Sequence, residues 1–332
     1  MDAAAIRRQL ADARDTLTHA WVAGIRAVRA ANPVEHIALR LHSDPVGGLD
    51  HLATRTAAGE LAVYLAAGRG AAREASAQLR EHDRISVRKK TITFEAEDPD
   101  VMSWAERSRL DLIQGLSFEQ RVMIRYELSV AQETGENPRV TATRIRDSIG
   151  LTSQQAQAVE RYRAQLEAGQ YAAALERQLA SGHSDRAIRS ARQRDVELTP
   201  QQIDLAVERY RTNMLAYRAE VIARTEAARV VNQGVDAMYR QALRRGDLDA
   251  EQIECGWIAT DDPRTRDTHA AMHGQIRAWG ELFQSPSGAL LLFPGDPSAP
   301  AKETANCRCA RTVRIRAARV AVSVPAMFGS AA

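Results

Sequence analysis

The sequence predicts a mainly α-helical protein, with a helical N-terminal two-thirds and a long helix leading into a small α+β module at the C-terminal end. Aromatic residues make up only 5% of the 332 residues, whereas Ala and Arg, which favour helices, are abundant. Apolar residues recur every three or four positions over residues 3–31 and 203–242. After Gly246, glycine and proline become frequent and apolar runs become short. That change is typical of a loop-rich unit with two or three short strands.

Charge and cysteine content exclude several classes of protein. The 45 basic and 42 acidic residues leave a net charge of +3, which by itself indicates no nucleic-acid partner. Nearly all basic residues are Arg, which fits either phosphate binding or a genome rich in Arg codons. The three cysteines do not form a disulfide framework and fit a reducing compartment. No stretch of 18 apolar residues predicts a membrane span, and the charged N-terminus does not resemble a signal peptide.

Residues 1–100 are predicted to form an N-terminal helical region with a short β element. The apolar periodicity of residues 3–31 predicts one amphipathic helix, which ends at an Asn-Pro pair. Shorter helical pieces are expected over residues 34–83. Residues 85–96 alternate β-branched and polar side chains and are the only predicted strand of the first half. The acidic run at 97–100 then marks a boundary.

A second helical domain is predicted over residues 101–200. The segment Ser117-Phe118-Glu119-Gln120 has the pattern of a capping box and predicts a helix start. Residues 151–155 and 198–202 also have the pattern of helix starts, and each leads to Val-Glu-Arg-Tyr. This echo fits either a duplicated binding unit or two helices that share a capping pattern.

Residues 201–318 are predicted to contain the long helix and the C-terminal module, followed by a flexible tail at 319–332. The apolar positions over 203–242 form one continuous stripe, along one helix or two helices end to end. Such a stripe fits either an oligomer formed through this helix or packing on other helices of the same chain.

Several short elements of the C-terminal part occur in a characteristic order within residues 219–316. They are Arg224-Thr225-Glu226, Asn232-Gln233-Gly234, Trp257, Asp262-Pro263-Arg264, His269, Gly274, Pro294-Gly295-Asp296, Glu303 and Asn306-Cys307-Arg308-Cys309. In this order they resemble the phage head-morphogenesis family, which includes the phage Mu F protein and minor head proteins of tailed phages. Residues 103–218 are similar, less specifically, to the helical part upstream in some of these proteins.

The resemblance implies a minor structural protein that acts in capsid assembly in the head interior or at the portal vertex of a phage or prophage. The implied partners are the portal protein and the major capsid or scaffold protein, with non-specific contact to packaged double-stranded DNA as a further option and no membrane partner. The implied location is the virion, with assembly in the host cytoplasm. No catalytic residue is implied, so an enzyme is not expected. Two alternatives are a Mu F-like carrier of a toxin or effector enzyme in residues 1–100, and a free-standing DNA-binding protein.

Two histidines and two cysteines in the module suggest a zinc site. A helix is expected from 263 to Gly274, which would place His269 and His273 on one face. Cys307 and Cys309 would share one face of a strand. Together these four side chains provide the donor set of a tetrahedral Cys₂His₂ zinc site. The alternative is that the cysteines are buried as small apolar residues beside a hydrogen-bonded His269.

Some features of the sequence weaken the zinc hypothesis. The Cys-x-Cys spacing is shorter than the usual gap between zinc ligands. The family resemblance also implies a Cys pair at the positions of Arg266 and His269, and a His at the position of Thr304. A nucleophilic Cys beside His269, or a metal nuclease built on Asp262 and nearby acids, finds less support, because nothing in the sequence marks an oxyanion hole or a ligand set.

The remaining motif residues are predicted to have structural roles. Arg224 or Glu226 would anchor the module to the long helix through ion pairs, while Asp262, Arg264, Gly274 and Asn306 would form its framework.

The end of the chain is basic. Arg311, Arg314, Arg316 and Arg319 are followed by no acidic residue, which fits non-specific contact with DNA phosphates. Alternatively, Arg314 and Arg316 form the solvent side of a last strand, with Val313 and Ile315 facing inward.

Overall fold

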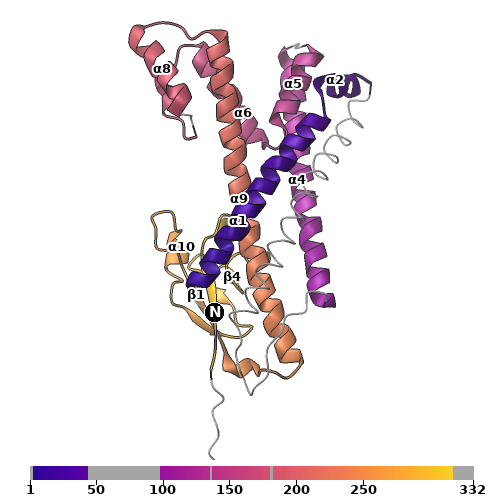
Figure 1. The fold of residues 1–332 in the computed structure, drawn as a ribbon, viewed down its shortest axis with the longest axis vertical. Helices are drawn as coiled ribbons and strands as arrows, with labels where there is room; N and C mark the ends of the chain where they lie inside the picture. Colours follow the sequence, from indigo (N-terminus) through magenta and orange to yellow (C-terminus); the bar gives the residue numbers. More distant parts are fainter. Residues whose placement is uncertain (1–2, 44–97, 135–136, 180–181, 317–332) are drawn as a thin grey trace, which may run out of the picture.

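The computed structural model describes residues 3–43, 98–134, 137–179 and 182–316. The predicted strand at 85–96, most of the helical pieces expected over 34–83, and the tail at 319–332 lie outside these residues. The predicted fold class is confirmed, since a mainly helical chain ends in a small module of short strands and helices (Figure 1).

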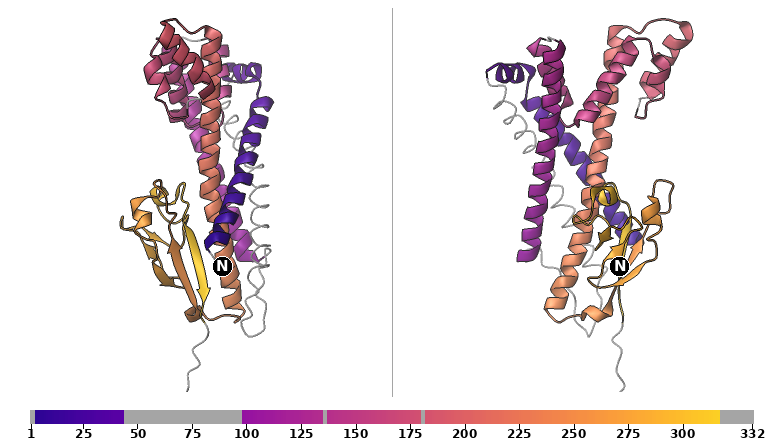
Figure 2. Two further views of the ribbon diagram at one scale, coloured as in Figure 1. Left: turned by 60° about the vertical axis from the view of Figure 1, so that its left-hand side comes forward. Right: turned by 180° about the vertical axis from the view of Figure 1, so that it is seen from behind.

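Two long helices form the frame of the molecule. Helix α1 (Ala3–Ala31) is continuous, as the sequence predicted. Helix α9 (Pro200–Arg244) is also one continuous helix and not two end to end. Helices α1 and α9 cross at an angle, and the N-terminal end of α1 reaches the C-terminal module (Figure 2). The apolar face of α1 is buried where the helices meet, and Trp21 and Ile25 are both fully buried.

Six further helices of the described residues surround the frame, and one of them, α4, is also long. They are α2 (Val34–Ser43), α4 (Pro99–Thr134), α5 (Pro138–Ser148), α6 (Ser153–Glu167), α7 (Tyr171–Leu175) and α8 (Gly182–Arg194). The helix start predicted at Ser117 is wrong, because α4 runs through it without a break. Instead of capping its own helix, Gln120 accepts a hydrogen bond of 3.2 Å from the backbone N–H of Gly150.

The sequence echo corresponds to two helix starts that are confirmed. Thr152 begins α6 and Thr199 begins α9, each with a complete capping box. The two helices then pack together, and the rings of Tyr162 and Tyr210 lie 4.5 Å apart between their centroids. The echo therefore has a packing role in this structure.

The C-terminal module contains more strands than expected. The described residues include a three-stranded antiparallel sheet in the order β2-β1-β5 and a two-stranded sheet of β3 and β4. The strands are β1 (Ile253–Ile258), β2 (Ile276–Ala278), β3 (Phe283–Gln284), β4 (Leu290–Leu291) and β5 (Ala310–Ile315), and the short helices are η1 (Ala250–Gln252), α10 (Asp267–Ala270) and α11 (Ala301–Thr304). The helix expected from 263 to Gly274 is reduced to the four residues of α10.

Helix α9 belongs to two hydrophobic cores. Its N-terminal half packs with α1, α6 and α8, and its C-terminal half packs with the module around Trp257 and Phe283. The stripe over 203–242 is thus largely buried within the chain, and an oligomer through this helix stays a prediction. Gly295 lies close against α9, because a Cβ atom there would lie 3.0 Å from the Cβ of Ala228, and its φ is +82°.

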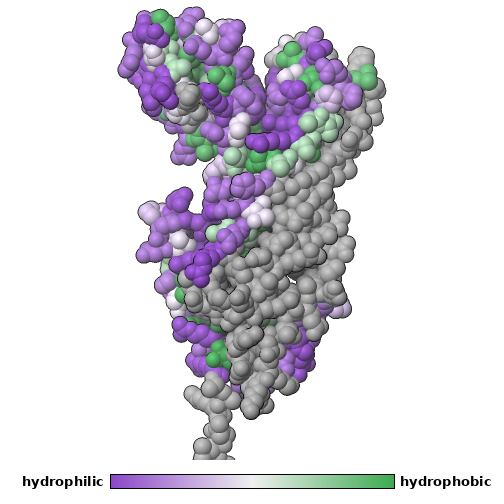
Figure 3. All heavy atoms as spheres, in the orientation of Figure 1, coloured by the Kyte–Doolittle hydropathy of each residue, from purple (hydrophilic) through white to green (hydrophobic). Residues whose placement is uncertain are grey.

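Among the described residues visible in Figure 3, hydrophilic side chains predominate, with hydrophobic ones scattered between them. None of the described helices combines the length and the apolar character needed to cross a membrane.

Candidate functional site

The most chemically distinctive feature of the module is a buried cluster of one histidine and two cysteines. His269 lies on α10, and Cys307 and Cys309 lie in the extended segment that leads into β5. The Nδ1 atom of His269 is 3.5 Å from the Sγ of Cys307 and 3.4 Å from the Sγ of Cys309. All three possible ligand atoms lie within 4.8 Å of one another, and the side chains are 1–2% exposed. The donor set and its geometry could hold a metal ion.

A buried carboxylate orients the histidine from the other side. The Nε2 atom of His269 lies 3.0 Å from Oε2 of Glu303, a residue of helix α11. Glu303 also accepts hydrogen bonds of 2.6 Å from the hydroxyl of Ser287 and 3.2 Å from that of Thr268. Burial opposes ionisation, but these hydrogen bonds and the nearby His269 lower the pKa of Glu303 overall. A carboxylate that fixes the ring of a metal-binding histidine is a recurrent arrangement.

A hydrogen bond between the two thiols shifts their pKa values in opposite directions. A hydrogen bond from Cys307, together with His269, lowers the pKa of Cys309 to about 5. The same hydrogen bond and burial raise the pKa of Cys307. A thiolate beside an imidazole is competent both as a metal ligand and as a nucleophile. Its burial restricts access for a substrate, so metal binding suits this cluster better than catalysis.

His273 is not brought into the cluster. Because α10 ends at Ala270, His273 lies in the following turn, where its side chain is exposed and its Nδ1 accepts a hydrogen bond of 3.2 Å from the N–H of Ala259. Gly274 ends this turn with φ +80° and donates its N–H to the carbonyl of Trp257 at 2.9 Å. The four-ligand set expected from the sequence is therefore reduced to three.

Arg224 and Thr225 on α9 hold the segment next to the cluster. The guanidinium of Arg224 donates to the side-chain oxygen of Asn306, and the hydroxyl of Thr225 accepts the backbone N–H of Asn306 at 2.8 Å. Asn306 has φ +57°, and it immediately precedes Cys307. Glu226 instead pairs with Arg229 on its own helix at 2.8 Å, and burial raises its pKa. Arg224 thus has a hydrogen bond to the module, while the ion pairs of Arg224 and Glu226 are both with residues of α9, so their role as anchors stays a prediction.

Asp262 and Arg308 join two loops of the module. Arg308 donates two hydrogen bonds to the carboxylate of Asp262, one of them 2.6 Å long, and the backbone N–H of Arg264 donates a third at 2.8 Å. The bonds from Arg308 are the largest cause that lowers the pKa of Asp262 to about 2. The side chain of Arg264 itself is exposed. Asp262 therefore connects these loops and stays ionised at physiological pH.

Arg311 does not fit the predicted DNA contact, because its side chain is 2% exposed. Its guanidinium lies 3.3 Å from the carboxylate of Asp236 and donates to the carbonyl of Asn232 at 3.2 Å. It also lies 5.0 Å from the ring centroid of Phe293. Arg311 is a buried connection between β5 and α9.

Unlike Arg311, the next two arginines of the chain are exposed. Arg314 is exposed on β5, and Arg316 is exposed and pairs with Glu254 on β1. Val313, just before Arg314, is buried and Ile315, between the two arginines, is partly buried, as expected for a strand with one solvent face. Arg319 lies outside the described residues.

Comparison with known proteins gives two matches to parts of the chain. Residues 173–312 match the family model described as "Phage Mu protein F like protein". The chain is also 36% identical over 93 residues to the Minor head protein GP7 of Bacillus phage SPP1. That alignment covers 28% of this chain and 28% of the relative. No solved structure matches the chain.

Proposed function

We propose, from the premise that residues 173–312 are a phage Mu F-like region, that this protein is a non-enzymatic structural component of a tailed-phage head. The observation that carries the proposal is the agreement between the family match and the similarity to a relative named as a minor head protein. The family match covers the part of the chain where α9 meets the module. A rigid contact between a long helix and a compact module suits a part that joins larger components.

The partners follow from this role. We place the protein in the virion, in the head interior or at the portal vertex, after assembly in the host cytoplasm. The portal protein and the major capsid or scaffold protein are the proposed protein partners, and packaged DNA is a further one. A phage or prophage genome would encode the chain.

The test is incorporation into heads in cells where the encoding genome assembles them. We expect the tagged full chain to co-sediment with head particles or with portal complexes. Gly295→Ala should reduce the amount incorporated, because the added Cβ meets α9 and the left-handed backbone is strained. Gly234→Ala is the matched control, since its Cβ would meet no atom within 4 Å. A folded wild-type chain that is absent from particles would contradict the proposed function.

We also propose that His269, Cys307 and Cys309 hold a structural zinc ion. Zn–S bonds of about 2.3 Å and Zn–N bonds of about 2.0–2.1 Å place a nitrogen and a sulfur ligand roughly 3.6 Å apart in a tetrahedron. The separations of 3.5 and 3.4 Å from the His269 Nδ1 atom fit this geometry closely. Glu303 already fixes the ring orientation that the metal requires. The fourth position would be taken by water or by a ligand from outside the described cluster.

Zinc content provides a direct prediction. The full chain, purified without chelator, should contain about one zinc per molecule, and its cobalt form should absorb in the near ultraviolet through thiolate-to-metal charge transfer. Replacing both cysteines, as Cys307→Ser with Cys309→Ser, should abolish binding. Cys255→Ser is the matched control, because Cys255 is buried in the same core but is not in the cluster. Equal metal content in the control and the double variant, or a wild-type chain that takes up no zinc, would disprove the site.

A further inference from the structure

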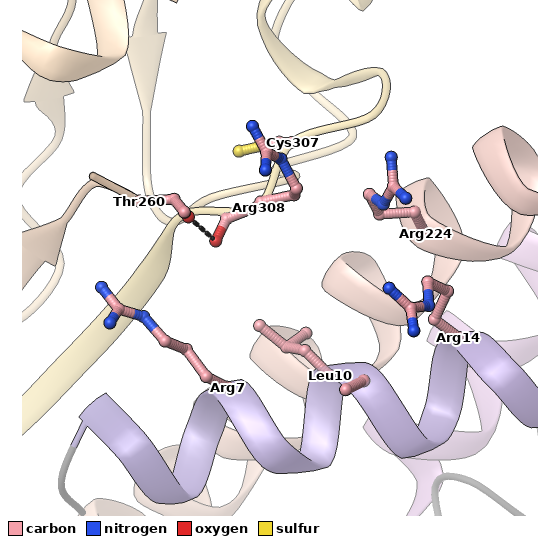
Figure 4. Close-up of a pocket in the computed structure, with 8 residues that line it drawn as sticks. Arg7, Leu10, Arg14, Arg224, Thr260, Cys307 and Arg308 are labelled. Carbon is pink, nitrogen blue, oxygen red and sulfur yellow. Dashed lines mark hydrogen bonds between the residues drawn. The ribbon is translucent and has the colours of Figure 1, made fainter. Parts of the chain in front are cut away.

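A small cavity lies where three distant segments of the chain meet. It has a volume of about 190 Å³ and is lined by α1, by α9 and by the loops before α10 and β5 (Figure 4). The lining residues are Arg7, Leu10, Ala11, Arg14, Arg224, Thr260, Cys307 and Arg308. Arg7 and Arg14 are seven positions apart on α1 and therefore share one face of that helix.

The lining of the cavity is strongly cationic. Four of its eight lining residues are arginines, and none is acidic. Three of the four arginines pair with a carboxylate, since Asp15 pairs with Arg14, Glu220 with Arg224, and Asp262 with Arg308. Arg7 donates to a backbone carbonyl, that of Ala259, at 3.2 Å. The positive charges therefore outnumber the carboxylates with which they pair, even before the exposed Arg264 nearby is counted.

Arg224 has one hydrogen-bond donor that is not satisfied by any described residue. Its Nε atom is buried and has no hydrogen-bond partner within the described structure. Burial lowers the pKa of Arg224, and the positive charges of Arg14, Arg308 and Arg264 lower it further. An anion in the cavity would offset this crowding of cations and could accept hydrogen bonds from the guanidinium groups.

We propose that this cavity binds a phosphate group, and that its source is the backbone of double-stranded DNA. Guanidinium groups match the oxygen geometry of phosphate, and four of them around one cavity form a contact independent of base sequence. The choice of DNA as the source rests on the proposed function in a DNA-filled head, whereas the phosphate chemistry rests on the cavity alone. The site differs from the basic C-terminal tail, because every lining arginine lies before β5.

The test uses the purified full chain and a short fluorescent DNA duplex, titrated at several salt concentrations. The variant Arg7→Gln with Arg14→Gln should weaken binding severalfold and lower the slope of log affinity against log salt by about 1, the change expected for one lost phosphate contact. The matched control is Arg8→Gln with Arg26→Gln, since both arginines are exposed on α1 and neither lines the cavity. Circular dichroism checks that both variants fold.

A second arm separates the sources of phosphate. Inorganic phosphate should compete with the duplex on the wild-type chain more strongly than sodium chloride of equal ionic strength, and this excess competition should disappear in the Arg7/Arg14 variant. Phosphate binding without DNA binding would overturn DNA as the source. Equal losses in the variant and the control, or equal competition by acetate and phosphate, would overturn the phosphate site itself. Because no head is needed, these outcomes are independent of whether the chain enters particles.

Discussion

Arg311→Ala should lower the free energy of unfolding by about 3 kcal/mol, because removing one member of a buried ion pair leaves an uncompensated charge. Asp236, its partner, is 5% exposed. The exposed Arg240 also pairs with Asp236, with its Nε atom 2.6 Å from the carboxylate. Asp236 would therefore keep one partner, and we expect a loss at the lower end of the roughly 3–5 kcal/mol typical for breaking a buried ion pair. The substitution also removes the guanidinium from its position between the rings of Phe293 and Trp279.

The matched control is Arg314→Ala on the same strand. Arg314 is exposed, so its loss should change stability by less than about 0.5 kcal/mol. Urea denaturation followed by circular dichroism measures both variants. If Arg311→Ala were as stable as Arg314→Ala, Arg311 would be accessible in solution, and its predicted contact with DNA would again be possible.

The burial of Arg311 could have been inferred from the sequence. Side chains alternate between the two faces of a strand. The prediction placed Val313 on the inner face and Arg314 on the outer one, and both positions agree with the structure. The same alternation places Arg311, two residues before Val313, on the inner face. The basic character of the tail favoured DNA contact, whereas the structure pairs Arg311 with Asp236 inside the protein.

The ligand cluster was predictable only in part. His269 and the two cysteines were recognised by type, and the structure brings them together. His273 was included because residues four apart share a helical face, but that argument requires a helix long enough to contain both. Glu303 could not be paired with His269 from sequence, since the two are 34 positions apart and no periodicity links α10 to α11.

The false helix start at Ser117 shows the limit of a local signal. A capping box indicates that a helix can begin at a position, not that the preceding residues leave the helix. Helix α4 continues through Ser117, and Gln120 forms its hydrogen bond with Gly150 instead. The same pattern at Thr152 and Thr199 does begin helices. Gly150, with φ +88°, interrupts the helical backbone before Thr152. Pro200 at the first helical position favours a helix start after Thr199.

Trp21→Ala should lower the free energy of unfolding by about 3–5 kcal/mol, as expected for removal of a fully buried tryptophan. Trp21 lies where α1 packs against α9, and the guanidinium carbon of Arg218 lies 5.7 Å from its ring centroid. Arg218 also donates a 2.7 Å hydrogen bond to the carbonyl of Gly150. The substitution therefore leaves a cavity and loosens a side chain that connects three segments. Trp21→Phe keeps part of the ring volume and should lose less stability.

This substitution also tests whether α1 belongs to the same cooperative unit as the phage Mu F-like region. That region starts at residue 173 and does not include α1, yet α1 packs on α9 and contacts β5. If the frame unfolds as one unit, Trp21→Ala shifts a single denaturation transition that far-ultraviolet and near-ultraviolet circular dichroism report together. Leu39→Ala, at an exposed position on α2, should leave that transition in place. Two separate transitions, with the one at higher denaturant concentration unchanged by Trp21→Ala, would show that the Mu F-like region is stable without α1. The cavity bearing Arg7 and Arg14 would then form only while α1 is docked.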